Sequence, residues 1–324
     1  MSHRTISIQN SKKTDNAHLD SVAKKGFSSF DIQLTRVNAS YENRRTGKLD
    51  VLHDISFTVH AGRRLVIMGE NGSGKTTLLR VLAGLLPYEG SILYGQRELR
   101  TIPTRTRAGL VCLMSQLTQS YYPYTVRETI MLGRYSKIQQ PDSGHNSSET
   151  TPTQKVISSK SELTAEWLTP KTTPLTKLFS ALTALSTTTG KADEKKVDAL
   201  LKDMNLLEIK DKRIDTLSGG QLQRVFLARA YAQDTPVMLL DEPMSHLDLR
   251  YQDELSQRLL HEKKHRTVIG VFHDLYMAAI IAEEVVLLKE GHLLYSGEAK
   301  AVFQNNELLS DAFGTDLSRR LTFI

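Results

Sequence analysis

Runs of apolar residues, some alternating with polar positions and some continuous, divide the chain into short strands. Alternation over Asp31–Val37 and Ile55–Val59 predicts two strands that each keep one solvated face. Continuous apolar runs over Leu65–Met68, Val237–Leu240 and Thr267–Phe272 predict strands that are buried on both faces. Because helical patterns separate the buried strands, the sequence predicts a largely parallel, doubly wound α/β sheet.

The same patterns place the remaining elements. Further strands are expected over Gly90–Gly95, Gly109–Gln116, Val285–Leu288 and His292–Tyr295. Helices are expected over Thr77–Ala83, Thr125–Leu132, Lys191–Glu208, the stretch after Gln221 up to Ala232, Leu249–Glu262 and Leu275–Ala282. Thr125 and Glu128 have the spacing of a capping box, and a polar loop from Ser40 to Lys48 is expected to contain Tyr41.

Two stretches lack this patterning. Residues 1–29 are polar without periodicity, which predicts a disordered N-terminal extension. Of the fifty residues from Pro141 to Gly190, twenty are Ser or Thr, so a flexible insertion is expected over about 139–190. Five apolar residues between Leu175 and Leu185 have helical spacing, as in a short helix that packs on the parent domain or one that binds a partner or a membrane surface. Trp167 has no assigned role.

Composition narrows the class of protein. With 324 residues, 40% of them hydrophobic, the chain can form one large α/β domain or two smaller ones. It has no apolar run of about 18 residues and no signal-peptide core, so a soluble cytoplasmic protein is expected. The formal charge of +6 would suit nucleic acid or an anionic membrane surface, but only as a weak indication. The single cysteine, Cys112, is expected to be a core residue rather than a reactive thiol.

The stretch Gly69-Glu70-Asn71-Gly72-Ser73-Gly74-Lys75-Thr76 connects a buried strand to a helix. Strand, glycine loop, Lys-Thr and helix is the context of a phosphate-binding P-loop. The glycines let backbone N–H groups curl around an anion, and the helix N-terminus adds the positive end of its dipole. Lys75 would contact the β- and γ-phosphates of a nucleotide, and the Thr76 hydroxyl would bind Mg²⁺. The alternative is a flexible turn between strand and helix.

Acidic residues follow the buried strand Val237–Leu240. Ligands of a parallel sheet bind at the carboxyl ends of its strands, where this strand presents Asp241 and Glu242. Asp241 could hold Mg²⁺ opposite Thr76, and Glu242 could polarise an attacking water as general base. Taken singly, either acid could instead be a helix N-cap or a solvent-exposed residue.

Two other strand ends have polar side chains. His273 follows Thr267–Phe272 and emerges at the same predicted edge as Asp241, so it could touch a γ-phosphate or could be a structural histidine. Gln116 ends the strand Gly109–Gln116, where it could contact Mg²⁺ and the attacking water.

A second anion-binding pattern is Leu217-Ser218-Gly219-Gly220-Gln221, in which a hydroxyl and two glycines precede a helix. It has no lysine and is far from Gly69–Thr76 in the sequence. Since one nucleotide needs one P-loop, a second phosphate site makes sense if each copy of the chain completes the site of another copy.

Together these residues resemble the ATP-binding subunit of an ABC transporter, over about residue 31 to the C-terminus. The matching residues are Tyr41 (the aromatic that stacks on adenine), Gly69–Thr76 (Walker A), Gln116 (Q-loop), Leu217–Gln221 (signature), Asp241 and Glu242 (Walker B), Ser245–Asp248 (D-loop) and His273 (switch histidine). The resemblance implies a P-loop NTPase fold over 30–324, with a mainly parallel core sheet, an antiparallel β subdomain and an inserted helical subdomain over about 115–235.

The resemblance also implies an ATPase that uses ATP and Mg²⁺ and acts as a head-to-tail homodimer or paired with a related subunit. The implied catalytic residues are Glu242, His273, Gln116 and Lys75. The implied ATP-binding residues are Tyr41, Gly69, Glu70, Asn71, Gly72, Ser73, Gly74, Lys75, Thr76 and Thr77, with Ser218, Gly219, Gly220 and Gln221 contributed to the site of the other copy. The implied Mg²⁺ ligands are Thr76, Gln116 and Asp241.

Four stretches resemble the ATPases of iron-siderophore, haem and cobalamin importers, namely Thr125–Tyr135, Ala232–Pro236, Ser245–Leu249 and Asn306–Leu317. This implies a peripheral protein on the cytoplasmic face of the cell membrane. Its partners would be an integral-membrane permease, docked near residues 116–135, and indirectly an extracytoplasmic substrate-binding protein. The chain departs from the pattern at His246, where alanine is commoner, and in its longer insertion.

Two alternatives remain open. The chain could be the ATPase of another ABC transporter, either another metal importer or an exporter. It could also be a soluble ABC ATPase that acts on nucleic acid or ribosomes, but such proteins usually have tandem ATPase domains or long coiled coils. With one Walker A motif and no sustained heptads, no nucleic-acid partner is expected.

Overall fold

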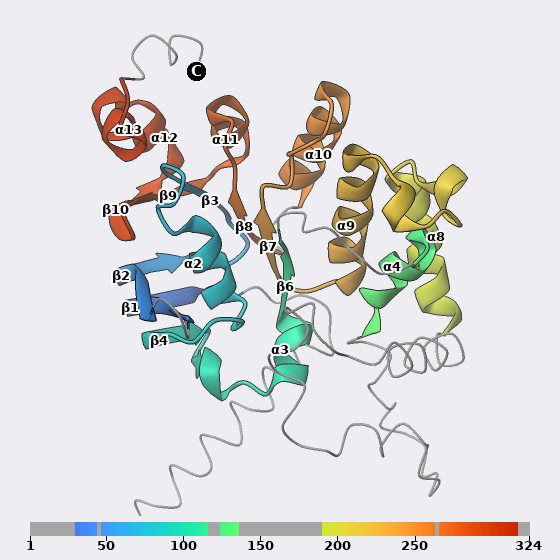
Figure 1. The fold of residues 1–324 in the computed structure, drawn as a ribbon, viewed down its shortest axis with the longest axis horizontal. Coiled ribbons are helices and arrows are strands. Elements are labelled where there is room, and N and C mark those ends of the chain that lie inside the picture. Colours follow the sequence, from blue (N-terminus) through green and yellow to red (C-terminus); the bar gives the residue numbers. More distant parts are fainter. Residues whose placement is uncertain (1–29, 44–46, 116–123, 136–189, 263–265, 317–324) are drawn as a thin grey trace, which may run out of the picture.

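The computed structural model describes residues 30–43, 47–115, 124–135, 190–262 and 266–316. Ten strands within these ranges form one sheet in the order β5-β4-β1-β2-β10-β9-β3-β8-β7-β6 (Figure 1). Several sequence predictions lie outside the described residues, namely the extension 1–29, Gln116, Trp167, Leu175 to Leu185 and all of the insertion except Gly190.

The strands are β1 (Ile32–Asn43), β2 (Gly47–Val59), β3 (Arg64–Met68), β4 (Glu89–Tyr94), β5 (Arg97–Glu98), β6 (Val111–Met114), β7 (Val237–Asp241), β8 (Thr267–Val271), β9 (Glu284–Lys289) and β10 (His292–Glu298). The helices are α2 (Lys75–Leu82), α3 (Thr104–Leu110), α4 (Val126–Leu132), α8 (Lys191–Asp203), α9 (Gly219–Gln233), α10 (Leu249–His261), α11 (Leu275–Ile281), α12 (Ala299–Phe303) and α13 (Asn306–Phe313).

The sheet has a parallel part and an antiparallel part. Strands β9, β3, β8, β7 and β6 are parallel to one another, whereas β9 is antiparallel to its other neighbour, β10. Strands β5, β4, β1 and β2 are antiparallel, and β10 connects the two parts by pairing His292 with His53. Helices α4, α8 and α9 pack on one another beyond the β6 edge (Figure 1). This arrangement confirms the predicted fold class.

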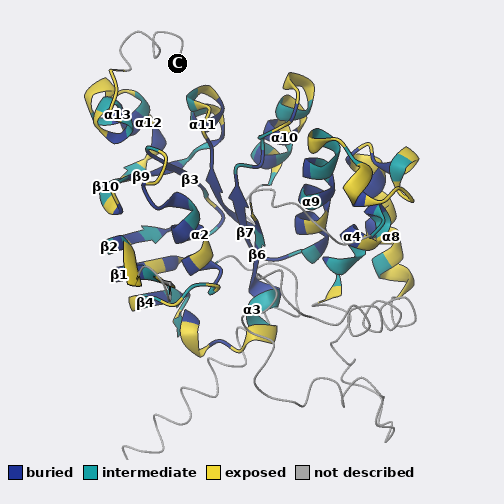
Figure 2. Cartoon of the chain, in the orientation of Figure 1, coloured by how far each residue is buried: buried dark blue, intermediate teal, exposed yellow. Residues whose placement is uncertain are grey.

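The parallel strands are almost entirely buried (Figure 2), and a hydrophobic core packs against each of their two faces. Successive side chains of a strand point to opposite faces, so Val66 and Met68 of β3 join one core and Leu65 and Ile67 the other. The first core contains residues of α8 to α13, and the second contains α2 and the antiparallel strands.

Cys112 belongs to the first core at 2% exposure, and burial raises the pKa of its thiol, which fits the predicted inert core residue.

The polar stretch from Ser40 to Lys48 was wrongly predicted to be a loop. Ser40 pairs with Asp50 and Tyr41 with Leu49, so β1 and β2 continue through it as a hairpin up to residues 43 and 47. Polar side chains did not signal a strand because the end of this hairpin is half-buried or exposed, whereas backbone pairing needs no apolar residues.

Two boundaries also differ from prediction. The strand expected from Gly109 begins at Val111, because Gly109 and Leu110 form the last turn of α3. The helix expected to reach Glu208 ends at Asp203, because Asn205 adopts a left-handed conformation with φ of 52°. Its neighbour Leu206 then donates its N–H to the carbonyl of Leu201 at 2.8 Å, a bond typical of helix C-termini.

Among the described residues, no helix combines the length and the apolar character that crossing a membrane requires.

The two helices that flank residues 136–189 contact each other directly. Arg134 Nε, just after α4, lies 2.7 Å from Asp193 Oδ1 in α8, and the Arg134 guanidinium also donates to the carbonyl of Ala232 at 2.8 Å. Replacing residues 139–189 with a short Gly-Ser linker should therefore keep the midpoint of thermal unfolding within about 3 °C, since loop closure depends weakly on length. Calorimetry tests this, with Arg134→Ala as a destabilised control; a fall of more than about 10 °C would contradict it.

Candidate active site

The loop after β3 depends on glycine at two positions. Gly69 has a φ of 140°, and a β-carbon there would lie 2.0 Å from the carbonyl oxygen of Leu288 in β9. Gly74, the N-cap of α2, has a φ of 98°, and a β-carbon there would lie 2.7 Å from a Leu52 methyl group. The first-turn N–H groups of α2 have no acceptor within the helix. The loop and helix therefore form the anion-binding geometry that the sequence predicted.

Lys75 lies folded over this loop. Its Nζ donates to the carbonyl oxygens of Gly69 at 2.8 Å and Glu70 at 2.5 Å, and the residue is only 7% exposed. Burial lowers the pKa of the Lys75 ammonium, while the carboxylates of Glu242, Asp241 and Glu70 oppose that shift. Lys75 is thus in the electrostatic field of both acids that follow β7.

Sheet register brings Asp241 to the loop. Asp241 pairs with Val271 of β8, and Val271 pairs with Ile67 of β3, so three strand ends lie level at one edge. Thr76 Oγ1 donates to Asp241 Oδ1 at 3.2 Å, and Asp241 is 1% exposed. Hydroxyl and carboxylate oxygens of this kind are ligands that Mg²⁺ prefers.

Glu242 and His273 meet beside this edge. His273 Nε2 lies 2.7 Å from Glu242 Oε1, with the two side chains 45% and 20% exposed. Glu242 has a φ of 51°, a strained conformation for a residue with a side chain, and strain of this kind is concentrated at active sites. A cavity of about 150 Å³ lies next to the pair, lined also by Ser245 and Gln252. That volume is large enough to admit water beside the carboxylate.

Tyr41 is placed by β1 at the start of α2. Its hydroxyl lies 3.4 Å from Thr77 Oγ1 and accepts a hydrogen bond from Arg80 at 3.3 Å. The aromatic ring is therefore next to the P-loop helix, as its predicted contact with a nucleotide base requires.

The second glycine motif lies at the head of α9. Ser218 Oγ accepts the N–H of Gln221 at 3.3 Å, and the Gln221 side chain accepts the N–H of Ser218 at 3.0 Å, a capping box. A β-carbon on Gly220 would lie 2.8 Å from the carbonyl of His246. The motif packs against the D-loop of its own chain, and α9 lies on the other side of β7 and β8 from α2 (Figure 1).

Some contacts of the site were not predicted from the sequence. Gln223 Nε2 donates to the carbonyl of Glu242 at 3.0 Å, and Ser245 Oγ donates to the same oxygen at 2.9 Å. The signal for Gln223 is a glutamine in helical phase with buried Leu227 and Ala230, at a position where an apolar residue is expected. The contact of Glu70 N–H with the carbonyl of Ala312 in α13, at 3.3 Å, had no sequence signal.

Comparison with known proteins gives consistent matches. The family model described as ABC transporter matches residues 52–245. YusV of Bacillus subtilis, named a probable siderophore transport system ATP-binding protein, is 31% identical over 79% of this chain and 78% of its own. The hemin import ATP-binding protein HmuV of Rhodopseudomonas palustris (strain BisA53) is 30% identical over 85% and 86%. The ferric enterobactin transport ATP-binding protein FepC of Escherichia coli is 28% identical over 83% of each chain.

Solved structures share the fold. A bacterial Atm1-family ABC exporter with ATP bound aligns over 88% of this chain and 42% of its own, with a TM-score of 0.62 and 21% identity. A metal-chelate type ABC transporter in an inward-facing conformation aligns over 87% and 88%, with a TM-score of 0.58 and 22% identity. Because one is an exporter, these likenesses support the fold and do not separate transport directions.

Proposed function

This chain belongs to the ABC transporter family of ATP-binding proteins, and on that premise we propose that it hydrolyses ATP to energise import of an iron chelate through a membrane permease. The observation that supports this best is the meeting of the P-loop, Asp241 and the Glu242–His273 pair at one edge of the parallel sheet. P-loop NTPases combine a phosphate-binding loop, an acidic Mg²⁺ ligand and a residue that orients the attacking water.

The described residues fit a bound nucleotide. Ser73 Oγ, within the glycine loop, is buried with no hydrogen-bond partner in the described part of the chain, so it can turn to a phosphate oxygen. A β-carbon on Gly72 would meet no atom within 4 Å, which leaves that side of the loop open. In this proposal Gly69 to Thr77 surround the phosphates, Lys75 leaves its loop carbonyls to contact them, and Tyr41 lies against the adenine.

Thr76 and Asp241 would hold Mg²⁺, with Gln116 as a further ligand by resemblance. The ion supplies charge stabilisation on the β- and γ-phosphates. Glu242 would accept a proton from the attacking water, and His273 would keep the carboxylate oriented and contact the γ-phosphate.

The signature motif supports a two-chain site. Ser218, Gly219, Gly220 and Gln221 form a helix N-terminus that suits an anion, yet their hydrogen bonds stay within the motif and the glycines face His246. We therefore assign this motif to the nucleotide of a second copy or a related subunit in a head-to-tail pair.

The transported substrate is proposed from the relatives. Their names specify siderophore, hemin, petrobactin and ferric enterobactin transport. Cobalamin, which is also an octahedral metal chelate, is the nearest alternative. In this proposal the chain is peripheral on the cytoplasmic face of the cell membrane, the permease is its direct partner, a substrate-binding protein acts outside, and nucleic acid is not a partner.

Reconstitution tests this function. The chain is purified with its copurifying permease, placed in liposomes, and assayed for phosphate release with the binding protein and a ferric siderophore or haem. We expect the ferric chelate to raise ATP hydrolysis several-fold, while the metal-free chelator, as the matched control, leaves the basal rate unchanged. Copurification with ribosomes and without a permease would contradict the proposal.

A further inference from the structure

We propose that Gln223 is a positioning residue for the catalytic carboxylate, and that through it the signature helix α9 sets the orientation of Glu242 in the same chain. This inference rests on the proposed function, because it assigns a role within the same hydrolytic site.

The contact is direct and buried. Gln223 is the fifth residue of α9 and is 1% exposed. Its Nε2 donates to the backbone carbonyl oxygen of Glu242 at 3.0 Å. Only the amide nitrogen can donate a hydrogen bond to a carbonyl, so this bond places Nε2, and not Oε1, toward Glu242.

The acceptor residue, Glu242, is held in a strained conformation by several hydrogen bonds. Glu242 holds a φ of 51°, and its N–H donates to the carbonyl of Val271 at 3.1 Å. Its carbonyl accepts three donors, which are Gln223 Nε2 at 3.0 Å, Ser245 Oγ at 2.9 Å and Ser245 N–H at 3.2 Å. A strained conformation persists only when its surroundings hold it. The direction of the Glu242 side chain toward His273 therefore depends on these donors.

The other half of the Gln223 amide argues against a packing role. Its Oε1 is buried and has no hydrogen-bond partner among the described residues, a condition that destabilises a fold. Methionine has nearly the same length and would fill the space without a buried unpaired oxygen. What the amide provides and methionine would lack is the N–H donor to the carbonyl of Glu242.

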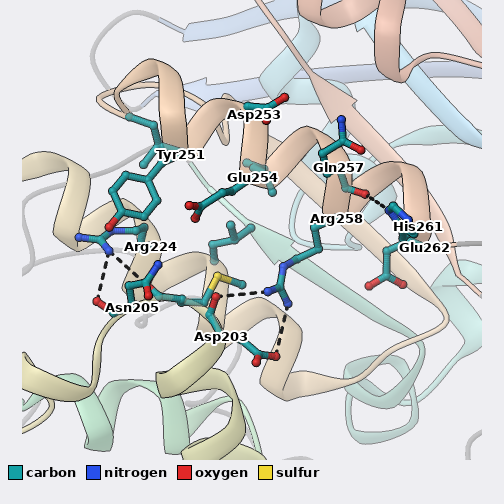
Figure 3. Close-up of a pocket in the computed structure, with 14 residues that line it drawn as sticks. Asp203, Asn205, Arg224, Tyr251, Asp253, Glu254, Gln257, Arg258, His261 and Glu262 are labelled. Carbon is teal, nitrogen blue, oxygen red and sulfur yellow. Dashed lines mark hydrogen bonds and ion pairs between the residues drawn. The ribbon is translucent and has the colours of Figure 1, made fainter.

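The turn of α9 that contains Gln223 also packs against α10 through the next residue, Arg224. The Arg224 guanidinium lies 4.0 Å from the centre of the Tyr251 ring and donates to the carbonyls of Met204 and Asn205 at 3.1 and 3.3 Å. These groups line one end of a groove of about 670 Å³ between α10 and the helical subdomain (Figure 3). This turn thus joins α8, α9 and α10, with Gln223 as its hydrogen bond into the active site.

Gln223 lies between the signature motif at the head of α9 and the catalytic carboxylate. Ser218 to Gln221, assigned to the nucleotide of the second copy, form the N-cap and first turn of α9, and Gln223 begins its second turn. A shift of the helix head on binding that nucleotide would reach Glu242 of its own chain through one hydrogen bond. Each ATP would thereby help to orient the carboxylate that acts on the other ATP.

The test replaces Gln223 with methionine in the full-length chain. We expect kcat for ATP hydrolysis to fall at least tenfold, with KM for ATP within twofold of wild type. Because binding stays intact while hydrolysis slows, the variant should also accumulate an ATP-bound dimer on size exclusion with Mg²⁺ and ATP, the result that is also expected for Glu242→Gln. A general loss of structure would weaken the dimer, so dimer accumulation distinguishes a loss of carboxylate positioning from a loss of folding stability.

The matched control is Gln233→Met. Gln233 lies on the same helix and donates its amide to the carbonyls of Ala108 and Val111 at 2.9 and 3.3 Å, away from Glu242. It should lose stability and keep the wild-type kcat. If Gln223→Met does not fold, Ser245→Ala removes the other side-chain donor to the same carbonyl and should lower kcat several-fold at constant KM.

A wild-type kcat in Gln223→Met would overturn the inference, and so would a wild-type kcat in Ser245→Ala where that variant is used instead. An equal loss of kcat in the control Gln233→Met would also overturn it. A wild-type chain that does not hydrolyse ATP, or a Glu242→Gln variant that does not dimerise, would instead count against the proposed function.

Discussion

Replacing Glu242 with glutamine is expected to lower kcat for ATP hydrolysis by about 10²–10⁴-fold, the usual contribution of a general base. Glutamine keeps the size of the side chain and can still hydrogen-bond to His273, which lies 2.7 Å from the carboxylate, but it does not accept a proton from water. Nucleotide binding should persist, because Lys75 and the Thr76–Asp241 pair are unchanged. Phosphate release measures the rate, and size exclusion with Mg²⁺ and ATP should show a stable dimer.

Glu254→Gln is the matched control for this variant. Glu254 is an exposed carboxylate on α10 that pairs with Arg250 at 3.0 Å on the helix surface, so the same chemical change there should leave the rate unaltered. A residual rate within tenfold of wild type would contradict the role of Glu242 as general base. A monomer under trapping conditions would contradict the two-chain site.

Gly69→Ala is expected to abolish measurable nucleotide binding and to lower the free energy of unfolding by about 2–5 kcal/mol. The new β-carbon would lie 2.0 Å from the Leu288 carbonyl oxygen, and a backbone atom in the middle of the sheet has little freedom to move. The positive φ of 140° adds strain for any residue with a side chain. Displacing Gly69 also displaces its carbonyl, which accepts a hydrogen bond from Lys75.

Gly47→Ala separates these two causes. Gly47 also has a positive φ, 79°, but a β-carbon there would meet nothing within 4 Å. Gly47→Ala should lower the free energy of unfolding by about 1–2 kcal/mol, from backbone strain alone, and should leave nucleotide binding normal. Denaturant unfolding measures the stabilities, and fluorescence of a nucleotide analogue measures binding. Equal losses in the two variants would show that contact with Leu288 is not the cause.

The fold class and most of the site were predictable because their determinants are local. The order of motifs along the chain indicates a P-loop ATPase, and apolar runs located β3, β7 and β8 to within one residue. The capping box at Thr125 was also predicted and is present. Each motif, strand and cap depends on residues that are close together in the sequence, and only the order of the motifs uses the chain as a whole.

The errors have a different physical origin. The β1–β2 hairpin was missed because strand pairing across Tyr41 and Leu49 uses backbone groups that any residue supplies. The end of α8 was missed because a left-handed asparagine, rather than a glycine, terminates that helix. Gln116, which lies outside the described residues, and the assigned roles of the other site residues stay predictions.

By itself the sequence determined the chemistry that is present: a glycine loop with Lys75 and Thr76, acids after one buried strand and a histidine after another. Only the tertiary structure decided which of these groups meet. Sheet register makes Asp241 level with Val271 and Ile67, residues that are far apart in the chain. The fold also brings Gln223 to the carbonyl of Glu242. Sequence patterns fix how each segment folds locally, whereas distances between distant segments follow from how strands pair and helices pack, which no local pattern encodes.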